Sequence, residues 1–148
     1  MSSDTLAQQG IEFALRGGKA KILVVDDDPG HLKLCRLVLE GQGFDVVTCT
    51  SYEAGVQSLE AEPFDFVLVS QGSQAFEGRK VLDRAIELDR HRAVLVVTRC
   101  IDMSCYLEAM HMGAVDYLEK PVPPAELLRF VQAHIRVTSK LRTQKSAA

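Results

Sequence analysis

The feature that most constrains the fold is a regular alternation of two kinds of apolar segment. Short, nearly continuous apolar runs are typical of strands buried on both faces. Each run is followed by a segment whose apolar residues recur at helical spacing. The expected strands lie at 21–25, 44–49, within 63–72, at 93–97 and at 115–118. Strands that alternate with helices predict a parallel sheet with helices on both faces.

The helical segments have recognisable ends. Pro29 stands where a first helical turn tolerates proline, and Gly41 follows the last residue of that segment. Thr50 and Glu53 have the spacing of a capping box that opens the next helix. The residues expected to face the core on the later helices are Val81, Leu82, Ala85, Ile86 and Leu88, then Met103, Leu107 and Met110, then Leu127, Leu128, Val131 and Ile135.

Composition excludes several classes of protein. A chain of 148 residues suits one domain, and 47% hydrophobic with 25% charged residues argues against global disorder. The net charge of −3 provides no basic field for direct nucleic-acid binding. The longest apolar runs are far too short to span a membrane. The first 19 residues lack the order of a signal peptide, so we expect a cytoplasmic protein.

Three parts are expected along the chain. Residues 20–136 should form the domain, and 1–19 an N-terminal extension that is either a short amphipathic helix or a tail. Residues 137–148 should form a basic C-terminal tail or linker, because no acidic residue follows Leu127. The tail is expected to be solvated, with contact to an acidic partner as the alternative.

Cysteines and histidines give weaker signals. The cysteines, which show no Cys-x-x-Cys spacing, are expected to be small buried or half-buried residues. A zinc site that includes His31 or His111 is the alternative. The histidines show no ligand spacing, so we expect surface or half-buried side chains. The cysteines are Cys35, Cys49, Cys100 and Cys105, and the histidines are His31, His91, His111 and His134.

Polar residues follow four of the expected strands. Asp26 and Asp27 follow the first strand, Ser70 ends the third, Thr98 ends the fourth and Lys120 follows the fifth. The carboxyl ends of parallel strands share one edge of a sheet, so these side chains should converge. Carboxylates suit Mg²⁺, and a lysine with a hydroxyl suits phosphate oxygens. The edge therefore predicts a site for a metal ion and a phosphoryl group.

At these residues the sequence resembles the receiver domain of two-component response regulators, over about residues 20–136. The resemblance implies a flavodoxin-like (CheY-like) three-layer α/β sandwich, with a five-stranded parallel sheet of order 2-1-3-4-5 and five helices. The motifs that carry it are Val24-Val25-Asp26-Asp27-Asp28-Pro29, Phe64-Asp65-Phe66-Val67-Leu68-Val69 with its loop to Glu77-Gly78, Val96-Val97-Thr98, and Gly113-Ala114-Val115-Asp116-Tyr117-Leu118-Glu119-Lys120-Pro121.

The resemblance also implies a role for each matching position. It implies a metal site, two groups that contact the phosphoryl group, and a pair of switch residues. These are Asp26, Asp27 and the Gly72 carbonyl for Mg²⁺, Thr98 and Lys120 for the phosphoryl group, and Thr98 with Tyr117 for the switch. Glu77-Gly78 replaces the family's usual Asp-Gly in the loop, which is a mild departure.

Two larger departures affect the chemistry. Ser70 stands where the family has the aspartate that accepts the phosphoryl group. A serine hydroxyl is protonated at neutral pH and needs an adjacent base, so we expect no phosphotransfer there. Loss of that carboxylate should also weaken or abolish Mg²⁺ binding. Arg99 stands where the family has a small residue, so it either occludes the site by pairing with Asp26 or Asp27 or swings into solvent.

The resulting expectation is an atypical pseudo-receiver of a bacterial two-component phosphorelay, which is not an enzyme and acts through protein contacts without aspartyl phosphorylation. Its partners would be a histidine kinase, an output domain or another regulator. A homodimer would form through the fourth helix, fifth strand and fifth helix. One alternative keeps phosphorylation, with Ser70 modified or a substitution of a native aspartate. Another is a flavodoxin-like small-ligand binder, disfavoured because the acidic turn after the first strand would repel an anionic cofactor.

Overall fold

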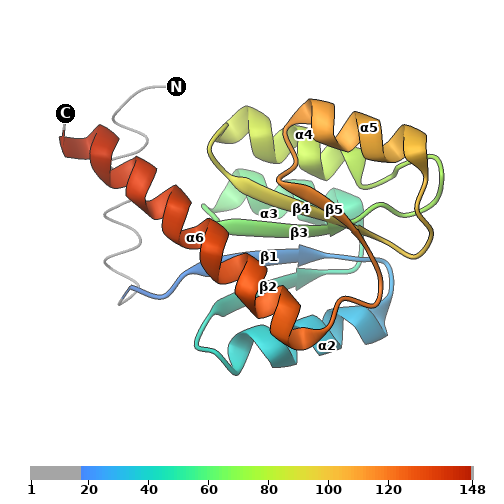
Figure 1. The fold of residues 1–148 in the computed structure, drawn as a ribbon, viewed down its shortest axis with the longest axis horizontal. Helices are drawn as coiled ribbons and strands as arrows, with labels where there is room; N and C mark the ends of the chain where they lie inside the picture. The colour runs from blue at the N-terminus through green and yellow to red at the C-terminus, as the bar shows by residue number, and fades with distance from the viewer. Residues whose placement is uncertain (1–17, 148) are drawn as a thin grey trace.

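The computed structural model describes residues 18–147, with side chains as far as Ile135. The N-terminal extension at 1–19, expected as a short helix or a tail, falls almost entirely outside this range. Strands and helices alternate along the described chain (Figure 1). The elements are β1 (Lys21–Val25), α2 (Pro29–Glu40), β2 (Asp45–Cys49), α3 (Tyr52–Ala61), β3 (Phe66–Ser70), α4 (Arg79–Leu88), β4 (Ala93–Thr98), α5 (Met103–Met112), β5 (Asp116–Glu119) and α6 (Pro124–Ala147).

The sheet has the predicted order. Its strands run β2-β1-β3-β4-β5, and every neighbouring pair is parallel. The order reverses at β1, which pairs with both β2 and β3, and such a reversal opens a crevice outside the carboxyl ends of the strands. Asp26 and Ser70 therefore stand at the crevice. The predicted flavodoxin-like fold is confirmed.

Two apolar cores cover the two faces of the sheet. Helices α3, α4 and α5 pack on one face, while α2 and α6 pack on the other (Figure 1). Phe66 and Val67, which are adjacent on β3, belong to opposite cores because successive side chains of a strand point to opposite faces. All residues of β3 and β4 are buried, which explains why their sequences are continuous apolar runs.

Two local predictions were wrong. Ser51, not Thr50, caps α3 by accepting a hydrogen bond from the Ala54 amide, and Glu53 instead pairs with Lys80. On α5 the core-facing residues are Cys105 and Ala109, whereas the predicted stripe of Met103, Leu107 and Met110 is exposed. Both stripes have helical spacing, and the small residues face inward.

The ends of the chain add two observations. Across the described residues, no helix combines the length and apolar character needed to cross a membrane. Helix α6 continues to Ala147, so the segment predicted as a basic tail or linker prolongs the last helix of the domain. The division at residue 136 stays a prediction.

Gly78, which precedes α4, offers a test of the packing at the end of β3. A Cβ at this position would lie 2.1 Å from the Ser70 carbonyl oxygen, which belongs to the backbone of a central strand. We expect Gly78→Ala to lower the free energy of unfolding by about 3 kcal/mol, measured by urea denaturation. Gly43→Ala is the control, because a Cβ there meets nothing within 4 Å and adds only the strain of a positive φ, about 1 kcal/mol. An equal decrease in the free energy of unfolding in the two variants would contradict the close contact between position 78 and the Ser70 carbonyl.

Candidate functional site

The carboxyl edge of the sheet places most of the predicted residues as expected. Asp26, Ser70 and Thr98 stand directly at the ends of β1, β3 and β4, and all three are buried. Lys120 follows β5, and its ammonium group reaches across the edge to Asp26. Asp27 lies beside them and is exposed.

The Asp26 carboxylate is the electrostatic centre of the site. Its Oδ2 atom accepts hydrogen bonds from Lys120 Nζ at 2.7 Å and pairs with His31 Nδ1 at 2.6 Å. Its Oδ1 atom accepts from the Asp28 amide at 3.0 Å. Burial is the largest influence and raises the pKa of Asp26, but the bonds to His31, Lys120 and Asp28, with the lysine charge, together outweigh it and lower the pKa to about 2. The carboxylate therefore stays ionised although it is buried.

His31 is a site residue for which the sequence indicated no role at this edge. It was expected as a surface or half-buried side chain, and it is half-buried. It lies in the first turn of α2, where the Asp28 side chain caps the helix by accepting from the Gly30 and His31 amides. The side chain points back from this turn onto Asp26. The sequence did contain a signal for this contact, because a residue in the first turn of the helix after β1 lies within reach of the end of that strand.

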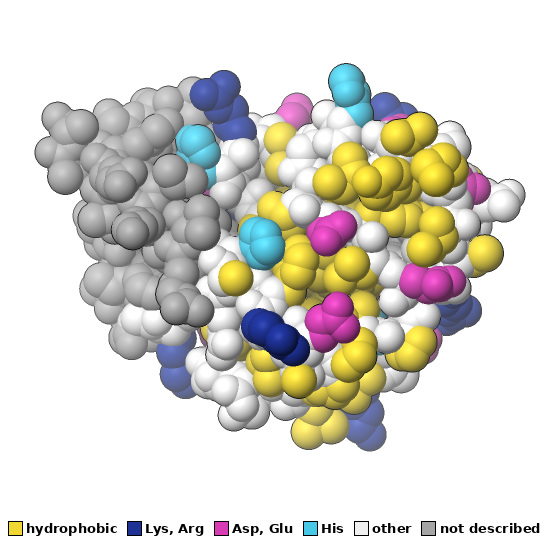
Figure 2. All heavy atoms as spheres, viewed as in Figure 1, with side chains coloured by type: hydrophobic (Ala, Val, Ile, Leu, Met, Phe, Trp, Pro, Cys, Tyr) yellow, Lys and Arg dark blue, Asp and Glu magenta, His cyan; other side chains and the backbone are white. Residues whose placement is uncertain are grey.

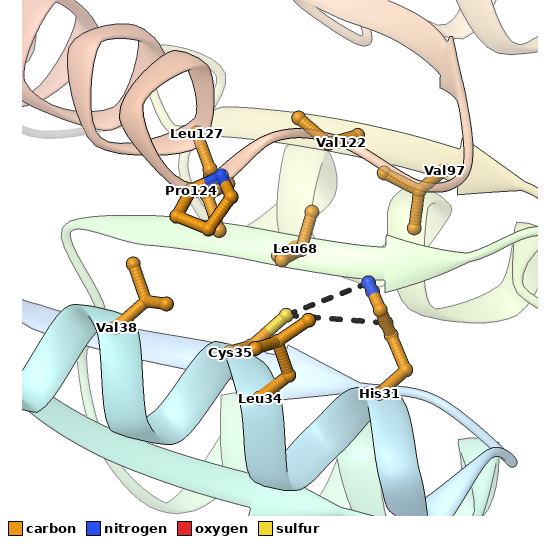
Figure 3. A pocket seen from close by; sticks show the side chains of 9 residues that line it. All are labelled: His31, Leu34, Cys35, Val38, Leu68, Val97, Val122, Pro124 and Leu127. Atoms are coloured by element: carbon orange, nitrogen blue, oxygen red, sulfur yellow. Dashed lines mark hydrogen bonds between the residues drawn. The ribbon is translucent and has the colours of Figure 1, made fainter.

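His31 also borders a small apolar pocket between α2 and α6 (Figure 3). Cys35 Sγ lies 3.6 Å from His31 Nε2 at the side of this pocket. Burial, assisted by the negative charge of Asp26, raises the pKa of the Cys35 thiol to about 12, so the thiol is protonated at neutral pH in this arrangement. Among the described residues, no three His, Cys, Asp or Glu side chains are grouped to hold a metal ion, which gives the zinc alternative no support.

The remaining cysteines follow the expectation in part. Cys49 and Cys105 are buried like Cys35, whereas Cys100 is exposed.

The Asp26 carboxylate is already engaged by hydrogen-bond donors. Its oxygens meet His31 Nδ1, Lys120 Nζ and the Asp28 amide. The other predicted ligands are the exposed Asp27 and the Gly72 carbonyl. A Mg²⁺ ion at this edge would compete with Lys120 and His31 for the same carboxylate, and weakened Mg²⁺ binding stays a prediction.

Ser70 is the last residue of β3 and is bonded to the loop that follows the strand. Its Oγ atom accepts a hydrogen bond from the Gly72 amide at 3.3 Å, and the residue is only 5% exposed. Gly72 has a φ of +85°, a region that favours glycine, and a Cβ there would meet Glu77 Oε1 at 2.5 Å. Glu77 accepts from the Ser73 amide and hydroxyl, so it folds back over the loop.

The two predicted switch residues are engaged in local contacts. Thr98 Oγ1 donates to the Cys100 carbonyl at 2.9 Å, within its own turn. Tyr117 is buried; its hydroxyl donates to Gln71 Oε1 and accepts from the Asp102 amide at 3.1 Å. No signal in the sequence marked Gln71, because it opens a segment with the composition of a polar loop, yet it is buried directly after the acceptor position.

Arg99 does not occlude the acidic pair. Its guanidinium pairs with Asp28 Oδ2 at 3.0 Å, and its side chain is 69% exposed. The contact required for occlusion, to Asp26 or Asp27, is absent from the contacts of the described residues. Arg99 instead lines the mouth of an open basin that also includes Gly30, His31 and Lys120.

A doubly wound sheet with an acidic pair, a hydroxyl and a lysine at its carboxyl edge defines the class of receiver-type signalling domains. The family model described as the response regulator receiver domain matches residues 22–132. The chain therefore belongs to the response regulator receiver family.

Individual relatives are similar at moderate identity. The chain is 31% identical over 134 residues to the transcriptional regulatory protein ZraR of Salmonella typhimurium, which covers 88% of this chain and 30% of that protein. It is 30% identical over 118 residues to the DNA-binding response regulator MtrA of Mycolicibacterium smegmatis, covering 80% and 51%. It is 30% identical over 116 residues to the sensor protein GacS of Pseudomonas syringae, covering 75% and 13%. The chain thus spans about a third of ZraR, half of MtrA and a small part of GacS.

Solved structures share the fold. A CheY-like receiver domain protein from Methanospirillum hungatei matches with a TM-score of 0.78 at 27% identity, covering 82% of this chain and 98% of that one. A receiver domain from Clostridium thermocellum matches with a TM-score of 0.74 at 29% identity, with the same coverage of both chains.

The paired carboxylate predicts a distinctive pH dependence. Because the pKa of Asp26 is about 2 in the folded protein against an ordinary 3.8, its contribution to stability is complete above pH 3.8 and is lost as pH falls through 2. Asp26→Asn should destabilise the protein by about 3 kcal/mol at pH 7, because it leaves Lys120 and His31 without their acceptor. The difference in free energy of unfolding between wild type and Asp26→Asn should decrease by about 2 kcal/mol as the pH is lowered from 5 to 2.

Urea denaturation followed by circular dichroism at several pH values measures this gap. Asp27→Asn is the matched control, since that neighbouring carboxylate is exposed and should contribute much less. A constant gap across the pH range, or equal effects at the two positions, would contradict the assignment.

Proposed function

We propose that this chain is an atypical receiver module of a two-component phosphorelay that signals through protein contacts and does not use aspartyl phosphorylation. The observation that carries the proposal is the buried Ser70 at the position of the family's acceptor. Acyl phosphate formation requires an ionised carboxylate, and serine carries a hydroxyl in its place. His31, the histidine nearest the site among the described residues, directs Nδ1 to Asp26 and so does not activate Ser70 as a base.

The state of the module would be set by its own contacts. In the family a phosphoryl group biases the equilibrium between arrangements of the threonine and the aromatic residue. Here Gln71 holds Tyr117 in the buried position and Thr98 bonds within its own turn. Internal hydrogen bonds thus support a single resting arrangement, which a bound partner would read or change.

The relatives indicate the kind of partner. ZraR is a transcriptional regulatory protein, MtrA a DNA-binding response regulator and GacS a sensor protein, and this chain aligns with a part of each. We therefore propose that it works beside output or sensor components in a bacterial cytoplasm. Contact with protein, not catalysis and not direct nucleic-acid binding, would be its mode of action.

Phosphorylation of Ser70 by a serine kinase is the less favoured candidate. A kinase must bring the hydroxyl to its own active site, but Ser70 is buried and its Oγ is bonded to the Gly72 amide. Exposure would require the β3–α4 loop to unfold locally.

A small phosphodonor tests the main proposal. After incubation with acetyl phosphate and Mg²⁺, intact mass spectrometry should show no added phosphoryl group, because Ser70 is not nucleophilic. A receiver domain with an aspartate at this position, treated in parallel, should gain the phosphoryl mass. A phosphoryl group mapped to Ser70 by peptide fragmentation would defeat the proposal.

The surface of α5 indicates where the module associates. Five large apolar side chains are exposed on and just before this helix, and Figure 2 shows hydrophobic side chains gathered over its position in Figure 1. We name this surface the α5 patch; its members are Ile101, Met103, Tyr106, Leu107 and Met110. It lies on the face of α5, β5 and α6 predicted for a homodimer. An apolar patch can pair with its own copy about a two-fold axis, because like apolar surfaces are complementary.

Leu107→Glu should therefore shift the protein towards monomer in sedimentation equilibrium over a concentration series. Leu107 is 59% exposed and Leu37, on α2, is 65% exposed. Leu37→Glu is thus a matched control that should leave self-association unchanged. A wild-type protein that stays monomeric at all concentrations would exclude the homodimer.

A further inference from the structure

Tyr52 reaches into the acceptor site from the first turn of α3. Although it follows the capping residue Ser51, its side chain is 9% exposed and belongs to the core beneath α3 and α4. The tip of the side chain passes beyond that core. A Cβ built on Gly72 would lie 3.0 Å from the Tyr52 hydroxyl oxygen. The phenol therefore ends beside the loop that closes over Ser70.

The surroundings of the hydroxyl are those of the predicted site. Burial raises the pKa of Tyr52 to about 12, and the negative charges of Asp27, Asp26 and Glu77 act in the same direction. A hydrogen-bonding interaction with the Ser70 side chain acts in the opposite direction and lowers the pKa of Tyr52. The phenol thus stands among the groups expected to surround a metal ion and a phosphoryl group.

The hydroxyl is buried and interacts with the Ser70 side chain, but it forms no hydrogen bond of good geometry among the described residues. A buried hydroxyl without such a bond is unusual and costs stability. Core packing of the ring does not account for it, because a phenylalanine would fill the same core without that cost. The hydroxyl is placed in the site, beside Gly72 and near Ser70.

We propose that Tyr52 is a built-in occupant of the acceptor pocket, whose side chain fills the space that a phosphorylated carboxylate and its metal ion would need. The proposal rests on the function proposed above, because it names what keeps the pocket closed. It has a specific consequence. Replacing Ser70 by aspartate is not sufficient to restore phosphorylation, since the longer side chain would meet the Tyr52 phenol.

Four variants in the Ser70→Asp background test this. The single variant S70D is compared with S70D combined with Tyr52→Ala, Tyr52→Leu or Tyr52→Phe. Each is incubated with acetyl phosphate and Mg²⁺, and the phosphorylated fraction is measured by intact mass. In the reaction, an oxygen of the introduced carboxylate attacks phosphorus, the bond from phosphorus to the acetyl oxygen breaks, and acetate leaves.

We expect S70D alone to remain nearly unmodified. Tyr52→Ala and Tyr52→Leu should each raise the rate of modification at least about tenfold over S70D, while Tyr52→Phe, which is shorter by a single oxygen, should raise it less. Tyr52→Leu keeps a large apolar side chain in the core, so it carries the test if the alanine variant does not fold. S70D with Leu59→Ala is the matched control, because it removes a buried side chain from the same helix away from the site and should behave like S70D.

Full modification of S70D alone would overturn the proposal, as would an equal rate in S70D and in its Tyr52→Leu combination. A gain in the Leu59→Ala control as large as in Tyr52→Leu would also overturn it, since loosening of α3 would then be the cause. Tyr52→Leu with Ser70 retained separates the two proposals. A phosphoryl group on that variant would contradict the proposed function while leaving the role of Tyr52 intact.

Discussion

The buried carboxylate of Asp26 is the interaction on which the site depends. An ionised group that is almost wholly buried at a strand end must be paired, because an uncompensated charge in a protein interior is costly. Lys120 and His31 supply that compensation from the β5–α6 connection and from α2, so one carboxylate connects three parts of the fold. In a receiver with a metal ion, the cation would share this task. In this structure, Lys120 and His31 lie against the charged carboxylate.

The loop after β3 is organised around the same edge. Gly78 allows the loop to pass against the Ser70 carbonyl, and Gly72 turns it where a side chain would collide with Glu77 and Tyr52. Gln71, the first residue after β3, is buried and bonds to Tyr117, so the residue next to the acceptor position is directly connected to the predicted switch. The loop after β3 and the aromatic residue of β5 are thus held together by a side-chain hydrogen bond.

The two layers of helices have different consequences for function. As far as its side chains are described, the large apolar residues of α6 pack on the sheet, and those of α2 do so apart from the exposed Leu34 and Leu37. On α5 the small residues Cys105 and Ala109 face the core, and the large apolar residues form the exposed α5 patch. The α5 patch is thus left at the surface, which fits the proposed role in protein contacts.

The sequence alone was sufficient to predict the fold and the residues that lie at the carboxyl edge of the sheet. Short apolar runs bounded by turn residues favour buried strands, and their alternation with helices predicts a parallel sheet whose carboxyl ends bring Asp26, Ser70 and Lys120 to one edge. Tertiary structure alone decided how the side chains at that edge are used. The turn of His31 onto Asp26, the reach of Tyr52 towards Gly72 and the bond between Gln71 and Tyr117 depend on rotamers and on packing between elements distant in the chain. The inward face of α5 was undecidable in the same way, because two stripes share helical spacing and only contact with the neighbouring helix and sheet selects the one with small side chains.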